Sequence, residues 1–185
     1  MRDSLLSKRE IIGFYGFCFF IYCLMGWIYE VILGLCYGHG FVNRGFLFGP
    51  WLPVYGIGAL LLILCLQPIF RKKRYLGKLP LTPFFIFIGT FVLTSVLEYI
   101  TGAALMEFYQ IRLWDYSADW LNINGYICPR TSFRFAIGGL LLFYVTQPLL
   151  RAWFVRWPVW LRKWLPLALT ILFLLDLVVS LNLRY

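Results

Sequence analysis

Five long apolar runs constrain this chain more than any other feature of its sequence. A transmembrane helix needs about 20 mostly apolar residues. Runs on this scale recur at residues 11–35, 46–70, 81–106, 133–150 and 164–183. Only 14% of the residues are charged, whereas a soluble domain carries roughly 25%. The sequence therefore predicts an all-α transmembrane protein with five spans. The second span begins irregularly, because Gly49, Pro50 and Pro53 break helix geometry.

The distribution of lysine and arginine predicts how the chain crosses the membrane, because these residues concentrate in cytoplasmic loops. Three lie before the first run, five in the connection after the second and four in the connection after the fourth, against five on the opposite side. We therefore expect a cytoplasmic N-terminus and an external C-terminus. The net charge of +9 resides largely in these short clusters between apolar spans, so no nucleic-acid partner is predicted.

The sequence also contains an internal repeat. Residues 57–71 align with residues 137–151 at an offset of 80, sharing Ile-Gly and Gln-Pro pairs and a closing arginine. Upstream the offset is 68, which aligns Glu30 with Glu98. Parallel repeats usually pack about an axis along the membrane normal, with the site at their interface. The repeat predicts a five-helix bundle built from two parallel helix-pair repeats plus a C-terminal fifth helix. The expected parts of this single membrane domain, residues 1–185, are residues 11–71, 79–151 and 164–183.

Two carboxylates fall inside predicted spans, where a charge is costly unless it is paired or hydrated. Glu30 and Glu98 each have small residues four positions before and after them, and this spacing places all of these on one helix face. In the predicted orientation, nearly all ionisable groups outside the basic clusters lie on the outer side of the membrane. This asymmetry predicts an outward-facing polar cavity. The candidate substrate- or ion-binding residues are Glu30, Asn43, Arg44, Glu98, Glu107, Asp115, Asn124, Arg130 and Arg134.

A structural interpretation of the same charged residues stays open. In this interpretation Glu30 pairs with Arg44, and Glu98 pairs with Arg130 or Arg134. Such salt bridges would fix the corners where helices turn, without binding any ligand. The sequence alone does not separate this role from a substrate or ion site.

Other motifs are less informative. Trp114-Asp115-Tyr116 is more often a loop anchor with an Asx-type cap than a catalytic element. A disulfide between Cys36 and Cys128, both on the predicted outer side, is left open. The sequence contains one histidine, His39, no zinc-type cysteine spacing and no Walker, GxSxG or HExxH motif. No catalytic residue, cofactor or metal is predicted, and any ATP hydrolysis would have to reside in another chain.

Several motifs resemble the ABC-transporter type IV membrane family, in order along residues 14–150. These motifs are Trp27-Ile-Tyr-Glu30, Asn43-Arg44-Gly45-Phe-Leu-Phe-Gly49-Pro50, Glu98-Tyr-Ile-Thr-Gly102, Glu107, Trp114-Asp115-Tyr116-Ser117 and Asn122-Ile-Asn-Gly125-Tyr-Ile-Cys128. The resemblance implies a bacterial-type multi-pass protein of the plasma (inner) membrane, labelled as a permease. Tyr126 stands where the family pattern leads us to expect a basic residue.

The residues and the resemblance together favour a transporter component whose substrate or coupling ion passes the outward-facing cavity. Two alternatives stay open: a membrane enzyme acting on lipid-linked substrates at the outer leaflet, and a non-catalytic subunit that stabilises a membrane complex. Five spans are few for a complete transport pathway. We therefore expect a homo-oligomer, or another membrane or ATPase subunit, as partner, besides the membrane lipids.

Overall fold

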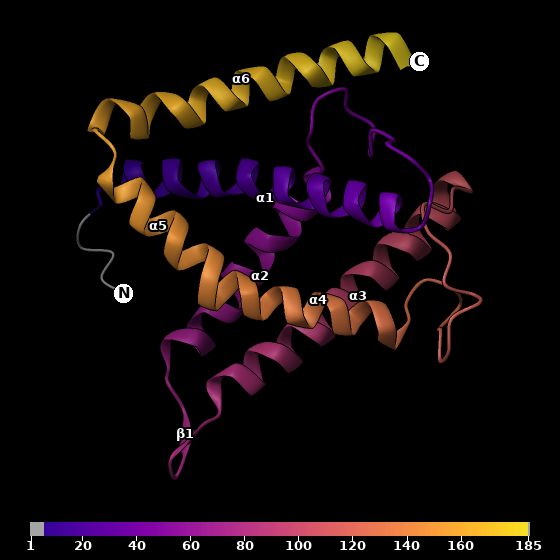
Figure 1. The fold of residues 1–185 in the computed structure, drawn as a ribbon, viewed down its shortest axis with the longest axis horizontal. Helices are drawn as coiled ribbons and strands as arrows, with labels where there is room; N and C mark the ends of the chain where they lie inside the picture. Colours follow the sequence, from indigo (N-terminus) through magenta and orange to yellow (C-terminus); the bar gives the residue numbers. More distant parts are fainter. Residues whose placement is uncertain (1–5, 185) are drawn as a thin grey trace. The chain divides into compact units, whose positions relative to one another are not determined.

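The computed structural model describes residues 6–184, and most of its regular elements are helices (Figure 1). Their bounds are α1 Lys8–Cys36, α2 Pro53–Arg71, β1 Tyr75–Leu76, β2 Leu79–Pro80, α3 Thr82–Tyr109, α4 Pro129–Leu141, the π-helical η2 Leu142–Thr146, α5 Gln147–Arg156 and α6 Val159–Arg184. Five helical segments of the described chain are long and apolar enough to cross a membrane. The predicted all-α transmembrane class is confirmed. The parallel-repeat arrangement and the single domain stay predictions, and residues 1–5 and 185 lie outside the described part.

The main difference from the predicted spans lies at the start of α2. This helix begins at Pro53, so the predicted start at Phe46 is wrong. Proline fits the first helical position because its missing N–H has no intrahelical partner there. The residues from 46 to 52 are non-helical. The fourth span is longer than predicted and runs over Pro129–Arg156, with η2 inside it.

Packing divides the chain into two compact units, which are described separately. Unit 1 comprises the residues up to 61 together with those from 147 onward, and unit 2 comprises residues 62–146. The division therefore passes through α2 and follows η2.

In unit 1, α1 and α6 lie side by side and run in the same direction (Figure 1). Near the start of both helices, Arg162 donates to Glu10 at 2.9 Å. The same guanidinium donates to the backbone carbonyls of Val155 and Trp157, so it also closes the corner between α5 and α6. Arg162 is one of the four basic residues in the connection after the fourth apolar run, and from the sequence alone these residues are interpreted only as a signal of membrane orientation. Its side chain is 15% exposed and internally bonded.

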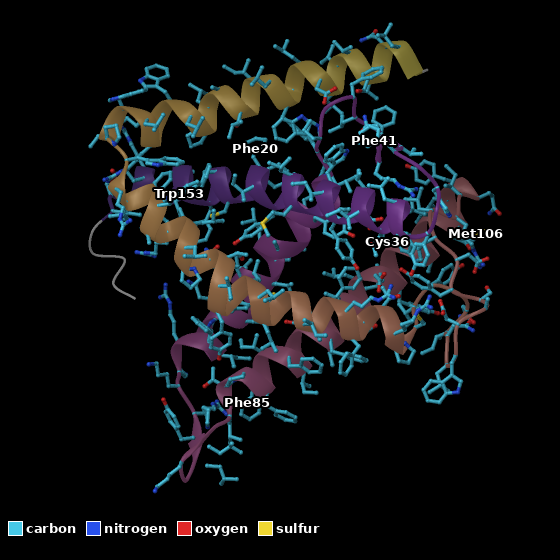
Figure 2. All side chains as sticks on the ribbon, in the orientation of Figure 1. Phe20, Cys36, Phe41, Phe85, Met106 and Trp153 are labelled. Carbon is cyan, nitrogen blue, oxygen red and sulfur yellow. The ribbon has the colours of Figure 1, made fainter. Side chains whose placement is uncertain are left out.

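Aromatic side chains fill the core of unit 1. Phe20 of α1 lies between α1 and α6, where its ring centroid is 5.9 Å from that of Phe173 (Figure 2). On another side of α1, the fully buried Phe154 of α5 lies 5.3 Å from Phe14 in an edge-on arrangement. Edge-on aromatic pairs at this spacing contribute beyond simple burial. α1 is therefore held between two helices from the C-terminal part of the chain.

In unit 2, α3 packs against α4 along small residues. A Cβ on Gly139 would lie 2.3 Å from Thr90 Oγ1, so the close approach depends on glycine. Between the same helices, Ser95 donates to Ser132 at 2.7 Å. The main neighbour of α3 is thus α4, whereas the main neighbours of α1 are α6 and α5. The first helices of the two predicted repeats, α1 and α3, therefore pack against different kinds of neighbour: α3 packs against the second helix of its own pair, whereas α1 packs against helices from the C-terminal part of the chain.

A short β-hairpin that the sequence did not predict joins α2 to α3. β1 pairs with β2 in antiparallel fashion, and Leu76 lies opposite Leu79. Gly77 has φ of 59° at the first position of the two-residue turn, a conformation that favours glycine. The Arg74 guanidinium lies 5.3 Å from the ring centroid of Phe85. The basic connection after α2 is therefore an ordered turn.

Candidate functional site

Residues 43–52, here called the re-entrant segment, lie between α1 and α2 and contain no helical structure. In Figure 1 this part of the chain rises from the end of α1 towards α6. Asp176 of α6 accepts hydrogen bonds from the backbone amides of Phe48, at 3.1 Å, and Gly49, at 2.8 Å. The fully buried Ser180 donates to the same carboxylate at 3.2 Å. A carboxylate of α6 therefore holds the backbone of a segment far away in sequence.

The re-entrant segment reaches well inside the ends of its neighbouring helices. Asp176 lies about 12 Å before the end of α6, at a rise of about 1.5 Å per residue. The Leu52 amide donates a hydrogen bond to the Cys23 carbonyl at 3.2 Å. Cys23 lies about 20 Å before the end of α1, at a rise of about 1.5 Å per residue. Leu47 is buried, with 2% of its surface exposed. Non-helical backbone inside a membrane is tolerated only where protein buries it or where it lines a water-filled space.

Asn43 holds the entrance of the re-entrant segment. Its side-chain oxygen accepts a hydrogen bond from Trp27 Nε1 at 2.7 Å, and its side-chain nitrogen donates to the carbonyl of Phe48 at 2.9 Å. This candidate binding residue is therefore engaged in the local fold.

Glu30 lies in the second half of α1, half-buried, and accepts a hydrogen bond from the Tyr55 hydroxyl in the first turn of α2. Room for this ring comes from Gly26, where a Cβ would lie 2.2 Å from Tyr55. Helical side chains lean towards the N-terminus, so Glu30 points to this turn of α1. Within the described residues no ion pair joins Glu30 to Arg44, so that predicted salt bridge is wrong.

The side chain of Arg44, which belongs to the re-entrant segment, contacts α1 one helical turn beyond Glu30. The ring of Tyr55 contacts α1 one turn before Glu30. The guanidinium of Arg44 packs against Gly34, where a Cβ would lie 2.6 Å from Nη2 and 3.3 Å from Nε. The Nε atom is buried and has no hydrogen-bond partner among the described residues. Three candidate residues, Glu30, Asn43 and Arg44, thus gather around the second half of α1 in unit 1.

Glu98 of α3 is the corresponding carboxylate of unit 2. Its Oε1 accepts a hydrogen bond from the Tyr116 hydroxyl at 3.1 Å, while its Oε2 is buried and has no partner within the described chain. Burial raises the pKa of Tyr116, and the neighbouring Glu98 adds to that increase. The hydroxyl therefore stays protonated and acts as a donor.

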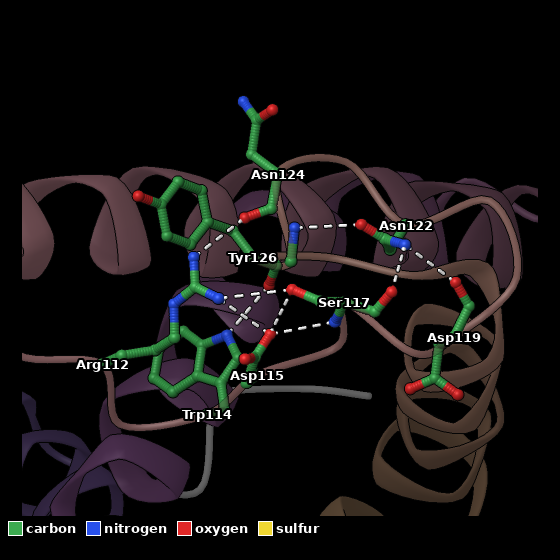
Figure 3. A network of polar contacts seen from close by, with 9 residues as sticks. Arg112, Trp114, Asp115, Ser117, Asp119, Asn122, Asn124 and Tyr126 are labelled. Carbon is green, nitrogen blue, oxygen red and sulfur yellow. Dashed lines mark hydrogen bonds and ion pairs between the residues drawn. The ribbon is translucent and has the colours of Figure 1, made fainter.

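Asp115 organises the loop between α3 and α4 (Figure 3). Its Oδ1 accepts from the Ser117 hydroxyl at 2.5 Å and the Ser117 amide at 2.9 Å, and it forms an ion pair with Arg112 at 2.8 Å. The hydrogen bonds from Ser117 and the adjacent guanidinium lower the pKa of Asp115, and the carboxylate in turn raises the pKa of Arg112. Trp114 Nε1 donates to the carbonyl of Tyr126 at 2.9 Å. The interpretation of this motif as a loop anchor with an Asx-type cap is confirmed.

The other candidates in this loop also have local partners. Asn124 and Gly125 have φ of 54° and 71°, the pattern of a type I′ turn, and Asn124 donates to the Tyr99 hydroxyl at 3.1 Å. Arg130 forms an ion pair with Asp119 at 2.8 Å. The predicted pairing of Arg130 with Glu98 is therefore wrong, because the two groups have other partners.

The remaining predicted residues lie at the ends of helices. Glu107 is exposed in the last turn of α3, and Arg134 is exposed in the first part of α4. The five cysteines, all within the described part, are free thiols, so the alternative of a Cys36–Cys128 disulfide is wrong.

Sequence reasoning missed the two tyrosines that bind the membrane carboxylates. Tyr116 was assigned only to a loop motif, and Tyr55 was counted among the apolar residues of a span. A tyrosine within a turn of a helix end is a usable signal, because its hydroxyl needs a partner when the ring is buried. The role of Ser180 has no comparable signal in the sequence.

These observations define an all-helical, multi-pass membrane protein with polar side chains inside its spans. The family described as "Putative ABC-transporter type IV" matches residues 17–181, and the chain belongs to this family. No curated protein and no solved structure matches the chain.

Proposed function

We propose that the protein is a permease-like component of a transporter in the plasma (inner) membrane, with its N-terminus in the cytoplasm and its C-terminus outside. The observation that carries this proposal is the re-entrant segment, held inside unit 1 by Asp176. Irregular backbone at such a depth suits a water-filled path, and broken helices form the binding sites of many transporters. Membership of the family supports the same class.

Glu30 and Glu98 are the proposed polar groups of a path that opens to the outside. Each accepts a hydrogen bond from a tyrosine hydroxyl, and the second oxygen of Glu98 has no partner in the described chain. A carboxylate in an apolar span is expensive to keep unless it meets water, a proton or a cation. The internal repeat, which aligns Glu30 with Glu98 in the sequence, is part of this proposal.

The proposed transporter needs further chains. This sequence contains no ATP-binding motif, so ATP-driven transport would require a partner that hydrolyses ATP. A second copy of the chain is the simplest way to complete a path from so few spans.

An uptake experiment tests the proposal. Inverted membrane vesicles from cells that express the wild type or the variants Glu30→Gln and Glu98→Gln are energised with ATP. The vesicles receive a ¹³C-labelled cell extract, and mass spectrometry measures the labelled solutes that they accumulate or exclude. We expect at least one solute whose movement depends on the wild type and is lost in both variants.

Lys78→Gln is the control, because it neutralises an exposed charge in the turn between β1 and β2, at a residue that is not among the candidate binding residues. The amounts of each variant in the membrane are equalised first. If no solute distinguishes wild-type vesicles from vesicles without the protein, the transport proposal is wrong. Equal uptake in all three variants would remove Glu30 and Glu98 from the path.

A further inference from the structure

We infer that Arg44 binds a phosphate group that does not belong to this chain. The guanidinium of Arg44 has a donor without an acceptor in the described chain. Its Nε is buried and makes no hydrogen bond within the described residues. A buried donor without a partner is costly, and a charged one more so. An acceptor from outside the chain would satisfy this donor.

The carboxylates of unit 1 do not supply this acceptor, because each described one is engaged elsewhere. Glu10 pairs with Arg162, Glu30 accepts from Tyr55, and Asp176 accepts two backbone amides. The nearest part of the sequence offers no alternative, since residues 31–97 contain neither aspartate nor glutamate. The positive charge of Arg44 thus has no carboxylate partner in the described part of unit 1.

The guanidinium also lies against α1. It packs on Gly34, where even a methyl group would come within 2.6 Å of Nη2. This contact places one edge of the planar group against the helix. A guanidinium presents a fork of N–H donors that matches two oxygens of a phosphate.

The position of Arg44 favours phosphate over other oxyanions. Gly34 lies about 3 Å before the end of α1, at a rise of about 1.5 Å per residue, which is the level of lipid headgroups for a membrane-spanning helix. Tyr37 and Phe41 are 60% and 70% exposed beside it, and such aromatic residues are enriched at the interface. The phosphate group belongs either to a phospholipid headgroup or to a soluble phosphate.

Thermal unfolding of the purified full chain, delipidated in dodecyl maltoside, tests this inference. The probes are dihexanoylphosphatidylglycerol, monoolein as a lipid without phosphate, and inorganic phosphate against sodium chloride of equal ionic strength. At a hundredfold excess over its dissociation constant, a ligand raises the melting temperature by about 5–10 °C. We expect this shift for the wild type and no shift with monoolein.

Two substitutions locate the effect. Arg44→Gln removes the donors, and Gly34→Ala displaces the flexible end of Arg44 without changing its charge; both should abolish the shift. Gly58→Ala is the matched control for the second, because a Cβ at Gly58 meets nothing within 4 Å, and it should keep the shift. Without ligand, Arg44→Gln should melt no lower than the wild type, since it removes an unpaired charge.

The two sources give different results. A shift with the phospholipid alone identifies a headgroup, whereas equal shifts with phospholipid and inorganic phosphate identify a soluble phosphate. The absence of any shift in the wild type, or an undiminished shift in Arg44→Gln, overturns the inference. The assay measures binding only, so its failure leaves the transport proposal standing, and failure of the uptake experiment leaves this site standing.

Discussion

Replacement of Asp176 by leucine should release the re-entrant segment. The carboxylate accepts the amides of Phe48 and Gly49, at 3.1 Å and 2.8 Å. A hydrogen bond to a charged group contributes about 1.5–3 kcal/mol. The Phe48 amide keeps Ser180 Oγ as a second acceptor at 3.3 Å, so the loss of both bonds to Asp176 costs about 3 kcal/mol, the lower limit for two such bonds. Leucine has a similar volume and accepts neither amide. Because 1.36 kcal/mol is a factor of ten, the lower limit corresponds to roughly a hundredfold increase in local opening.

Amide hydrogen exchange measured by mass spectrometry on the full chain in detergent checks this expectation. Peptides that cover the Phe48 and Gly49 amides should exchange roughly a hundredfold faster in Asp176→Leu. Asp176→Asn should give a smaller change, because the amide side chain keeps one acceptor. Thr170→Val is the control in the same helix, since the Thr170 hydroxyl bonds only to its own helix, at the Pro166 carbonyl. Unchanged exchange in Asp176→Leu, or an equal increase in the control, would refute the reasoning.

Three further substitutions test other contacts. Gly139→Ala should lower the free energy of unfolding by about 1–3 kcal/mol, as measured by thermal unfolding. Gly138→Ala is its control and should be neutral or stabilising, because a Cβ at Gly138 meets nothing within 4 Å. Equal effects of the two substitutions would contradict the packing of α3 on α4 at Gly139. Arg162→Gln should cost about 3 kcal/mol because it breaks a largely buried pair, whereas the exposed Lys163→Gln should change stability by less than about 0.5 kcal/mol. Because the folded pKa of Asp115 is lowered, its carboxylate stabilises the loop above an ordinary value of about 3.9 and loses this effect as the pH falls. The protection factors of the loop amides, which correct for the intrinsic pH dependence of exchange, should therefore fall on acidification in the wild type but already be low at neutral pH in Asp115→Asn. Identical pH profiles would speak against this role.

The features that sequence reasoning predicted correctly depend on neighbours in the chain. The five spans follow from the length of apolar runs, and the irregular approach to α2 follows from Gly49 and Pro50. The Asx-type anchor at Asp115 joins residues two positions apart. Such local preferences need no knowledge of tertiary packing.

The features that it missed depend on partners far away in the sequence. Glu10 and Arg162, separated by 152 positions, and Gly49 and Asp176, separated by 127, gave no local signal. Sequence reasoning left open a salt bridge between Glu30 and Arg44. The structure instead selects Tyr55, because Gly26 leaves room for its ring on the side of α1 towards which Glu30 leans.

The bond between Gly49 and Asp176 has a consequence for biosynthesis. A membrane protein is inserted from its N-terminus while the ribosome is still translating it, and Asp176 lies in α6, which follows the other four described spans in the sequence. The amides of Phe48 and Gly49 must therefore wait until α6 has been made before their acceptor arrives. During this interval the nascent protein carries exposed backbone donors in or near the bilayer, where water is scarce. Insertion of α6 is then the step at which the segment between α1 and α2 acquires its final form.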